Sequence, residues 1–334
     1  MGAPKRIVAA ASLIAGLAVV VASTSSSSAG ASTASSSGKG AKIAFACATP
    51  ALNSFYAPFE AGAADAAKQL GVSVTYTGLS AVQSAAAEAQ VVQAAINTHP
   101  AALIVCNFFP RAITPLIRQA IAARIPVFDT GNNAGPAAAA GALATVGQND
   151  YLGGQDAALR MIAAGVKHPL CVDQVPDNPD VASRCQGFAA EYTAHRLSVK
   201  NLNIPTLDLK NVTLQISDMK GVLSADQSLD GMIELGPEQG PAGVQAWTEA
   251  GRSNPGSHVA TFDMSTNIAN EIRSGQLMFA IWQQPYLEGY LPVVLATLYL
   301  AHGYAPPGEV LTGPTIVTKS NLAIVKTALA KGQA

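Results

Sequence analysis

The sequence predicts an α/β protein made of two doubly wound, parallel-sheet (Rossmann-like) lobes joined by a hinge. Its 334 residues suffice for two domains of ordinary size. Because 49% of them are hydrophobic, both domains can bury a core. Short apolar runs alternate with longer helical stretches, and this pattern restarts near the middle of the chain. Buried runs separated by helices are typical of a parallel sheet covered by helices.

The first half of the chain carries five apolar runs of strand length. They are rich in Ala, Val, Ile and Leu and lie at 42–47, 72–78, 101–106, 125–130 and 143–147. Helices are expected between the first four runs at about 56–70, 82–97 and 111–123. The first of these ends at Gly71, because glycine readily adopts the left-handed conformation that terminates a helix.

The second half repeats this alternation of strands and helices. Strands are expected at 169–175, 197–204, 229–236, 257–263 and 277–282. Helices are expected at about 151–164, 181–195, 209–224, 239–251, 265–273 and 285–302. Each half therefore reads as one α/β unit of domain size.

The N-terminus has the pattern of an export signal. Lys5 and Arg6 precede an apolar core from 7 to 22, and Ala29-Gly30-Ala31 offers a cleavage site. A retained membrane anchor is the alternative, but the apolar core is shorter than the ~20 residues that a spanning helix needs. We therefore expect an exported protein in the periplasm, cell envelope or extracellular space.

The remaining boundaries follow from composition and from the strand pattern. A signal peptide is assigned to 1–31 and a Ser- and Gly-rich linker to 32–40. The N-terminal lobe is placed at 41–149 with a returning segment near 265–282, and the C-terminal lobe at 150–310. A strand that crosses the hinge and a C-terminal helix are placed at 311–334.

Composition and motifs exclude several functions. Only 12% of the residues are charged and the formal net charge is −1, so the basic face that nucleic acid requires is not expected. The chain has no G-x-S-x-G elbow, no H-E-x-x-H and no G-x-G-x-x-G fingerprint. We therefore expect no catalytic residues, metal or cofactor, and an exported hydrolase is the weakest alternative.

Polar and aromatic residues follow the predicted strands. Ligands of open parallel sheets bind beyond the carboxyl ends of the strands, so these residues are candidates for a binding site. Aromatic rings suit the C–H faces of a polyol, and amides and carboxylates suit its hydroxyls. Each residue could instead cap a helix or fill the core. The candidates are Asn53, Phe55, Tyr56, Asn107, Phe108, Asp129, Gln148, Phe262, Asp263 and Gln283.

Several segments resemble the type I periplasmic binding proteins of the sugar-transporter class, the ribose- and galactose-binding group. These are GGQDAALRMIAAG (153–165), RCQGF (184–188), ATFDMS (260–265), QQPYLEGYLPV (283–293) and LTGPTIVTKSN (311–321). The resemblance extends from about 42 to 325. It implies the type I periplasmic-binding-protein architecture, in which three crossing strands join two lobes that close on one ligand. It also implies a monomer that delivers a sugar or polyol to a membrane ABC permease.

The resemblance assigns ligand contacts by position. Asn53, Phe55 and Tyr56 resemble contacts of the first lobe, and Arg184 resembles the arginine that grips sugar hydroxyls. The pair Phe262-Asp263 and the amide of Gln283 follow, whereas Gln284 shapes a turn. The chain departs from ribose binders at Asn107-Phe108-Phe109-Pro110, Gly131-Asn132 and Gly236. A sugar alcohol, a deoxy sugar or another small polyol therefore suits it as well as ribose.

Four cysteines in an exported chain favour disulfides over metal ligands, with buried free thiols as the alternative. Cys171 and Cys185 are the easiest pair because they are close in sequence. Cys47 and Cys106 end strands one and three, which are neighbours in the doubly wound order, and the ~4.8 Å between adjacent strands is within reach of a disulfide. We predict both pairs.

Two other classes of protein use this fold: DNA-binding regulators and binding proteins that feed a sensor kinase. A DNA-binding regulator would carry a helix-turn-helix where this chain has its signal and linker, so that alternative is rejected. A binding protein that feeds a sensor kinase cannot be separated from a transport protein by the residues alone.

Overall fold

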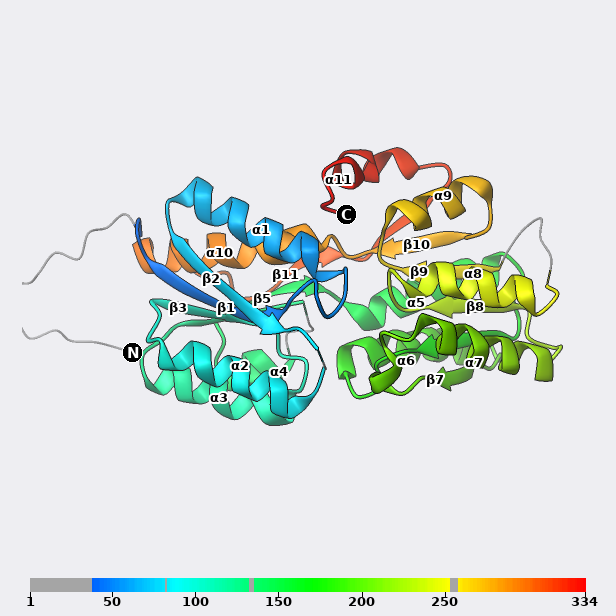
Figure 1. The fold of residues 1–334 in the computed structure, drawn as a ribbon, viewed down its shortest axis with the longest axis horizontal. Coiled ribbons are helices and arrows are strands. Elements are labelled where there is room, and N and C mark those ends of the chain that lie inside the picture. The colour runs from blue at the N-terminus through cyan, green and yellow to red at the C-terminus, as the bar shows by residue number, and fades with distance from the viewer. Residues whose placement is uncertain (1–37, 82, 132–134, 253–257) are drawn as a thin grey trace, which may run out of the picture. The chain divides into compact units, whose positions relative to one another are not determined.

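The computed structural model describes residues 38–81, 83–131, 135–252 and 258–334, all of which belong to one compact unit (Figure 1). The expected signal peptide, 1–31, lies outside the described residues, as does most of the expected linker. No described helix is both long and apolar enough to cross a membrane.

The first sheet contains six parallel strands in the order β11-β5-β4-β3-β1-β2. The strands are β1 (Lys42–Ala48), β2 (Ser73–Leu79), β3 (Ala102–Val105), β4 (Val127–Thr130), β5 (Ala144–Gln148) and β11 (Gly308–Gly313). Without β11, this is the 2-1-3-4-5 order of a doubly wound sheet, as expected from the sequence.

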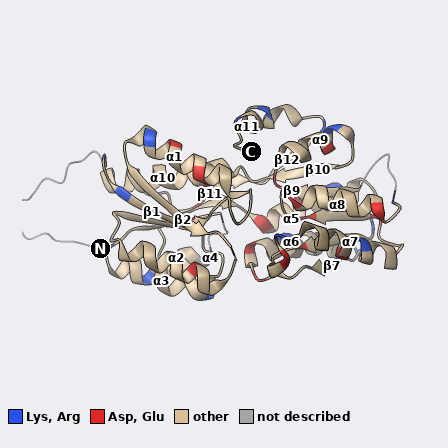
Figure 2. Ribbon diagram, in the orientation of Figure 1, with Lys and Arg blue, Asp and Glu red and all other residues tan. Residues whose placement is uncertain are grey.

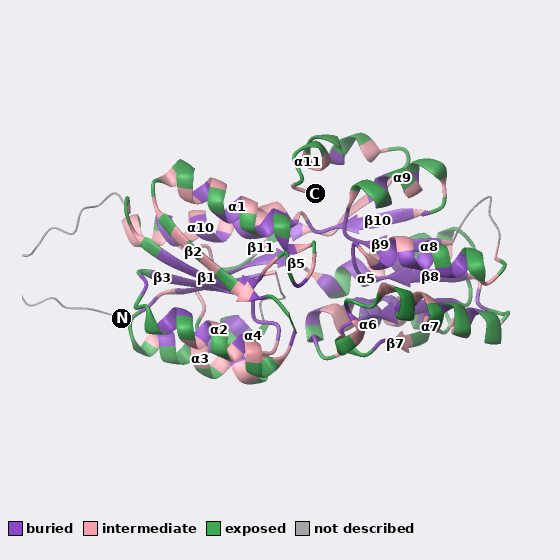
Figure 3. Ribbon diagram, in the orientation of Figure 1, coloured by how far each residue is buried: buried purple, intermediate pink, exposed green. Residues whose placement is uncertain are grey.

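Helices cover both faces of the first sheet. They are α1 (Tyr56–Leu70), α2 (Ala85–Asn97), α3 (Pro110–Ala122), α4 (Gly135–Ala140) and α10 (Pro285–His302). Side chains alternate along β1, so Ile43 and Phe45 pack in the core beneath α1 and α10, whereas Ala44 and Ala46 pack in the core beneath α2 and α3. The inner strands β1, β3, β4 and β5 are accordingly buried between helices whose outer faces are exposed, whereas the edge strands β2 and β11 are only partly buried (Figure 3).

The second sheet repeats this order as β12-β10-β9-β8-β6-β7. Its strands are β6 (Pro169–Asp173), β7 (Lys200–Asn203), β8 (Gly231–Glu234), β9 (Val259–Phe262), β10 (Phe279–Trp282) and β12 (Thr315–Thr318). All pairs are parallel except β10 with β12. The two-lobed, doubly wound α/β fold that the sequence predicts is thus confirmed.

The helices of the second lobe also lie on both faces of its sheet. They are α5 (Asp150–Ala163), α6 (Pro179–Ala194), α7 (Val212–Ala225), α8 (Gln239–Glu249) and α9 (Thr266–Ser274). Residues of α5 and α6 share one core cluster, and those of α7, α8 and α9 share the other. After β12 come the 3-10 helix η2 (Leu322–Val325) and the short helix α11 (Lys326–Ala330).

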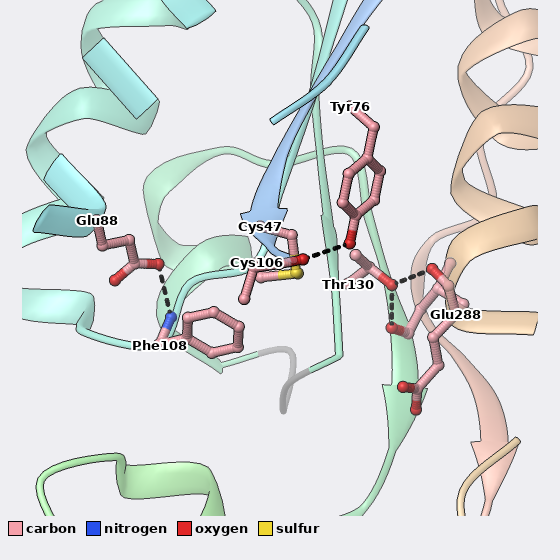
Figure 4. The surroundings of a disulfide bond; sticks show 9 residues. Cys47, Tyr76, Glu88, Cys106, Phe108, Thr130 and Glu288 are labelled. Carbon is pink, nitrogen blue, oxygen red and sulfur yellow. Dashed lines mark hydrogen bonds between the residues drawn. A yellow bond between two sulfur atoms is a disulfide. The ribbon is translucent and has the colours of Figure 1, made fainter. Parts of the chain in front are cut away.

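The segment expected to return to the first lobe near 265–282 does not do so. It forms α9 and β10, and β10 pairs with β9 and β12 inside the second sheet. The return is made instead by α10, which packs along α1, and by β11. Thr130 donates a 2.6 Å hydrogen bond to the backbone carbonyl of Glu288, which ties α10 to β4 (Figure 4).

The chain therefore crosses between the sheets three times, after β5, after β10 and between β11 and β12. The crossings meet at Gly313. A Cβ there would lie 3.1 Å from Gln148 Oε1 and 3.1 Å from the Cα of Gln283, so a side chain would press on both other crossings. Gln284 adopts a left-handed conformation and donates to the carbonyl of Thr312. The expected turn-shaping role of Gln284 agrees with this geometry.

Candidate ligand-binding site

A cavity of about 70 Å³ lies at the carboxyl ends of the strands of both sheets. Both lobes contribute to its wall, and so does the second crossing through Gln283. This is the edge at which open parallel sheets bind their ligands. Seven predicted residues line it: Asn53, Phe55, Tyr56, Phe108, Arg184, Asp263 and Gln283.

The first lobe supplies an aromatic wall. Phe55 and Tyr56 stand at the start of α1, with ring centroids 5.2 Å apart, and Phe108 lies 6.0 Å from Tyr56. Phe59, one turn further along α1, completes the wall. Asn53 Oδ1 accepts a hydrogen bond from the backbone of Phe55 at 2.9 Å and so fixes the turn into the helix. The wall offers ring faces to the C–H groups of a ligand.

A buried carboxyl group holds Phe108 in this wall. One oxygen of Glu88 accepts a hydrogen bond from the backbone N–H of Phe108 at 2.9 Å (Figure 4). The other accepts one from the backbone N–H of Phe109 at 3.0 Å. Burial raises the pKa of Glu88 to about 8, against the lowering effect of these two bonds. Cys106, two residues before Phe108, forms a disulfide with Cys47. The loop after β3 is therefore fixed by this disulfide and by Glu88.

Arg184 is the cation of the cavity wall among the residues that the structure describes. Its Nε donates to Asp150 Oδ1 at 2.7 Å and its Nη1 to the carbonyl of Leu235 at 2.8 Å. The guanidinium lies over the ring of Phe262, 4.6 Å from its centroid. Burial acts to lower the pKa of Arg184, but the neighbouring Asp150 and Asp263 raise it by more. The pKa is therefore raised overall, and the guanidinium stays charged. Arg184 Nη2 reaches Gln283 Oε1 at 3.5 Å.

Asp263 and Gln283 form the next link of the same network. Gln283 Nε2 donates to Asp263 Oδ1 at 2.5 Å. Burial raises the pKa of Asp263 to about 6, although Arg184 and the bond from Gln283 lower it. Asp263 also has a left-handed backbone, with φ of 68°, stabilised where its N–H donates to the carbonyl of Ile281. The network thus holds a carboxylate, an amide and a guanidinium in fixed orientation toward one cavity.

Four predicted residues lie near the cavity but do not line it. Asn107 and Asp129 are buried within the first lobe, and Asp129 Oδ2 accepts from Thr145 at 3.3 Å. Gln148 donates to Asp150 Oδ1 at 2.7 Å, and Phe262 lies beneath Arg184. Gln148 and Phe262 thus support the lining residues Asp150 and Arg184.

Several lining residues were not predicted. They are mainly Gln83, Asp150, Gln174, Asn178, Asp180 and Gly236. A sequence signal existed for Asn178-Pro179-Asp180, since an N-cap residue followed by proline marks a helix start, here directly beyond β6. Asp150, Gln174 and Gly236 likewise follow strands, so the same rule that found Asp263 covers them.

Both predicted disulfides are present. Cys47–Cys106 joins the ends of β1 and β3 with a Cα–Cα distance of 4.8 Å. Cys171–Cys185 joins β6 to α6 with a Cα–Cα distance of 5.9 Å, and Cys185 is next to Arg184 in the sequence. All four cysteines are therefore paired, and the alternative of buried free thiols is wrong.

The comparisons with known proteins agree with this architecture. Residues 43–304 match the family described as the periplasmic binding protein domain. The crystal structure of a carbohydrate transporter from Acidothermus cellulolyticus 11B in complex with myo-inositol is 32% identical, with a TM-score of 0.80, and the match covers 88% of this chain and 100% of that one. An ABC transporter solute-binding protein from Agrobacterium vitis, bound with α-D-tagatopyranose, is 25% identical with a TM-score of 0.73, covering 87% and 98%.

One curated relative completes the comparison. The xylose/arabinose-binding protein XylF of Sulfolobus acidocaldarius is 25% identical over 293 residues, which are 81% of this chain and 69% of that protein.

Proposed function

This chain belongs to the periplasmic binding protein domain family, and from that premise we propose that it captures a small polyol or sugar in the cavity between its lobes and delivers it to an ABC permease. The observation that carries the proposal is the composition of the cavity wall. Aromatic rings from the first lobe face a hydrogen-bonded polar network from the second, and a hydroxylated ring has complementary faces and edges.

Each part of the site has a defined task in binding. The rings of Phe55, Tyr56 and Phe108 cover C–H faces of the ligand, while Asp263 and Gln283 accept and donate hydrogen bonds to its hydroxyls. A wrong ligand leaves such buried groups unpaired, at about 1–3 kcal/mol each. The protein does not transform its ligand. Binding favours the arrangement in which both lobes contact it, and a permease can recognise that arrangement.

The family and the N-terminal pattern support an exported protein. The apolar core at 7–22, with positive charges before it and small residues after it, is the pattern of a secretory signal. We place cleavage near 31 and the working protein in the periplasm, cell envelope or extracellular space, as a monomer. Mass spectrometry of the protein from its native cells tests the cleavage, and an intact N-terminus would contradict it.

The relatives narrow the ligands to be tested first. One relative is crystallised with myo-inositol and another with α-D-tagatopyranose, and a third is named for xylose and arabinose. Each of these is a small polyhydroxylated molecule. A thermal-unfolding screen of the purified chain against these compounds, with amino acids and nucleosides for contrast, tests the class. A micromolar ligand at millimolar concentration adds about 4 kcal/mol to the stability of the folded state.

A matched pair of variants locates the binding site. Gln283→Leu should weaken the ligand found in the screen at least tenfold in a calorimetric titration, because it removes a buried donor and acceptor. Gln245→Leu changes an exposed amide on α8 and should leave the affinity unchanged. Stabilisation by an amino acid or nucleoside alone, with every polyol and sugar inert, would overturn the proposed ligand class.

A further inference from the structure

Three buried glutamines connect the interior of the second lobe with the cavity wall. Gln215 lies on α7, Gln239 begins α8 and Gln174 follows β6. Of the three, Gln174 lines the cavity. Charged residues are sparse along the ribbon of both lobes (Figure 2), so uncharged groups such as these amides contribute to the choice between ligands.

Hydrogen bonds fix the orientation of the two inner amides. Gln215 Nε2 donates to the backbone carbonyls of Asp208 and Leu209, both at 2.9 Å. A carbonyl oxygen only accepts, so the NH₂ group of Gln215 must face these two carbonyls. Its Oε1 therefore points the other way, where it accepts from Gln239 Nε2 at 3.2 Å. This bond turns Gln239 Oε1 away from Gln215, and that oxygen has no donor among the residues that the structure describes.

The amides of Gln239 and Gln174 share the space beside Gly236. A Cβ added at Gly236 would lie 2.5 Å from Gln239 Oε1 and 2.9 Å from Gln174 Nε2. With the orientation of Gln239 fixed, the NH₂ group of Gln174 faces an acceptor. The opposite orientation of Gln174 would direct two acceptors into the same space. The side-chain oxygen of Gln174 is therefore turned away from Gln239.

Gln174 Oε1 is a buried acceptor that lacks a donor. The residue is 5% exposed, and this oxygen has no hydrogen-bond partner in the described part of the chain. Buried polar atoms in folded proteins are almost always paired. Because Gln174 lines the cavity, a bound ligand can supply the donor.

We propose that Gln174 is a specificity-determining residue, which accepts a hydrogen bond from one hydroxyl of the bound polyol or sugar. The inference rests on the proposed function and narrows it, because the ligand must carry a donor at the position nearest the loop between β6 and α6. A ligand with a hydrogen, an ether oxygen or a carbonyl there leaves the Gln174 oxygen unpaired. We expect such a ligand to bind about tenfold more weakly, which corresponds to about 1.4 kcal/mol.

The test uses ligand analogues that cannot donate. The probe is whichever of myo-inositol, D-tagatose, D-xylose and L-arabinose binds most tightly in calorimetric titration, together with its deoxyfluoro analogues. In these, fluorine replaces one hydroxyl at a time and donates no hydrogen bond. At one position the replacement should weaken binding about tenfold to the unaltered protein but less than about twofold to Gln174→Met. Equal losses in the two proteins at every position would overturn the inference and leave the proposed function intact. If no polyol or sugar binds, both fail.

Stability measurements separate recognition from a structural role of the amide. Gln174→Met should bind the unmodified probe about tenfold more weakly. The midpoint of urea unfolding of its ligand-free form should stay the same or rise, because the lost acceptor had no donor. Gln227→Met is the matched control, since Gln227 is exposed and donates to the carbonyl of Ser224, and it should change neither measurement. A lower midpoint with unchanged affinity in Gln174→Met would show that the amide is structural and would refute the inference.

Gly236→Ala tests the position of the amide without removing it. The added methyl group would press on the ends of two flexible side chains, so the fold can accept it while the Gln174 amide is displaced. We expect an affinity for the probe about tenfold lower and the same loss of dependence on the hydroxyl donor as in Gln174→Met. Affinity and donor dependence equal to those of the unaltered protein would contradict the orientation assigned to Gln174.

Discussion

At the scale of single residues, Arg184 supports the fold and, in the proposed function, also contacts the ligand. Removing its side chain leaves Asp150 as a buried carboxylate without its ion-pair partner at 2.7 Å. Breaking a buried pair in this way costs about 3–5 kcal/mol of stability. We therefore expect Arg184→Ala to lose that much in urea unfolding, together with ligand binding.

The double variant Arg184→Ala/Asp150→Asn distinguishes the two roles of the arginine. It also removes the buried negative charge of Asp150, which the single variant leaves without its ion-pair partner. The double variant should therefore recover part of the lost stability, while ligand binding stays abolished. Equal stability losses in the single and double variants would show that the ion pair is not what makes Arg184 structural.

Through the titration of Asp263, we expect ligand affinity to increase with pH and the stability of the ligand-free protein to decrease with pH. Its folded-state pKa of about 6 lies above its ordinary value, so the ligand-free protein loses stability as pH rises from about 4 to 6. A ligand that donates to Asp263 favours the carboxylate and lowers this pKa. Affinity should then be about tenfold weaker at pH 5 than at pH 7, as measured by calorimetric titration.

The charged groups that face Asp263 decide how this titration is interpreted. Arg184 stays protonated throughout, whereas Asp150 and Glu288 also have raised pKa values and lie close enough to interact with Asp263. Asp263→Asn should flatten the pH dependence of whatever affinity remains. A slope that persists in this variant would assign the proton to Asp150 or Glu288 instead.

At the scale of elements, glycines set the closest helix contacts of both lobes. A Cβ at Gly62 of α1 would collide with the backbone of Tyr286, and one at Gly289 of α10 with the backbone of Phe59. Gly154 and Gly187 repeat this arrangement between α5 and α6. Since α1 carries Tyr56 and Phe59 of the aromatic wall and α6 carries Arg184, these helix contacts position the cavity wall.

Gly62→Ala should therefore separate α1 from α10 and destabilise the protein by about 1–3 kcal/mol, the usual cost of overpacking. Gly221→Ala in α7 is the matched control, because no atom lies within 4 Å of the added Cβ. There alanine should stabilise by up to about 1 kcal/mol through its helix propensity. Chemical denaturation of both variants measures the difference, and similar values for the two would contradict the packing argument.

The two disulfides should contribute unequally to stability. Cys47–Cys106 closes a loop with a sequence separation of 59 and Cys171–Cys185 one of 14. In the chain-entropy account these correspond to about 4 and about 3 kcal/mol. Replacing each pair by alanine and comparing midpoints of denaturation tests the order. The reverse order would show that packing at the strand ends outweighs loop closure.

At the scale of the whole molecule, the features that could be predicted from the sequence are those set by local residue patterns. Apolar runs located the strands, and the rule that ligands bind at strand ends found Tyr56, Asp263 and Gln283. The return of the chain was placed wrongly because it depends on the close packing of α10 on α1, two helices far apart in sequence whose contact no local pattern reveals. Likewise, Asn107 and Asp129 stand at the right edge but are buried away from the cavity. Asp129 lies within β4, where successive side chains face opposite sides of the sheet, and the direction of Asn107 depends on the turn after β3.

A surface lysine links the two lobes beside the cavity. Lys210 of the second lobe donates to the carbonyls of Ala51 and Ser80 of the first, at 2.8 and 3.2 Å. These bonds exist only while the lobes are in contact, and none of them involves the cavity wall. Lys210→Ala should therefore raise the dissociation rate of the ligand and weaken affinity about 3–10-fold, which corresponds to about 0.5–1.5 kcal/mol.

Lys220→Ala is the control for this contact, because Lys220 pairs with Glu249 within the second lobe. It should leave binding unchanged in stopped-flow measurements of association and dissociation. If Lys210→Ala slowed association and left dissociation as it was, the lysine would not act by holding the closed lobes together, and the prediction would be wrong. Faster dissociation with unaltered association would mean that contacts outside the cavity set how long the ligand is retained, and therefore how long a permease has to recognise the loaded protein.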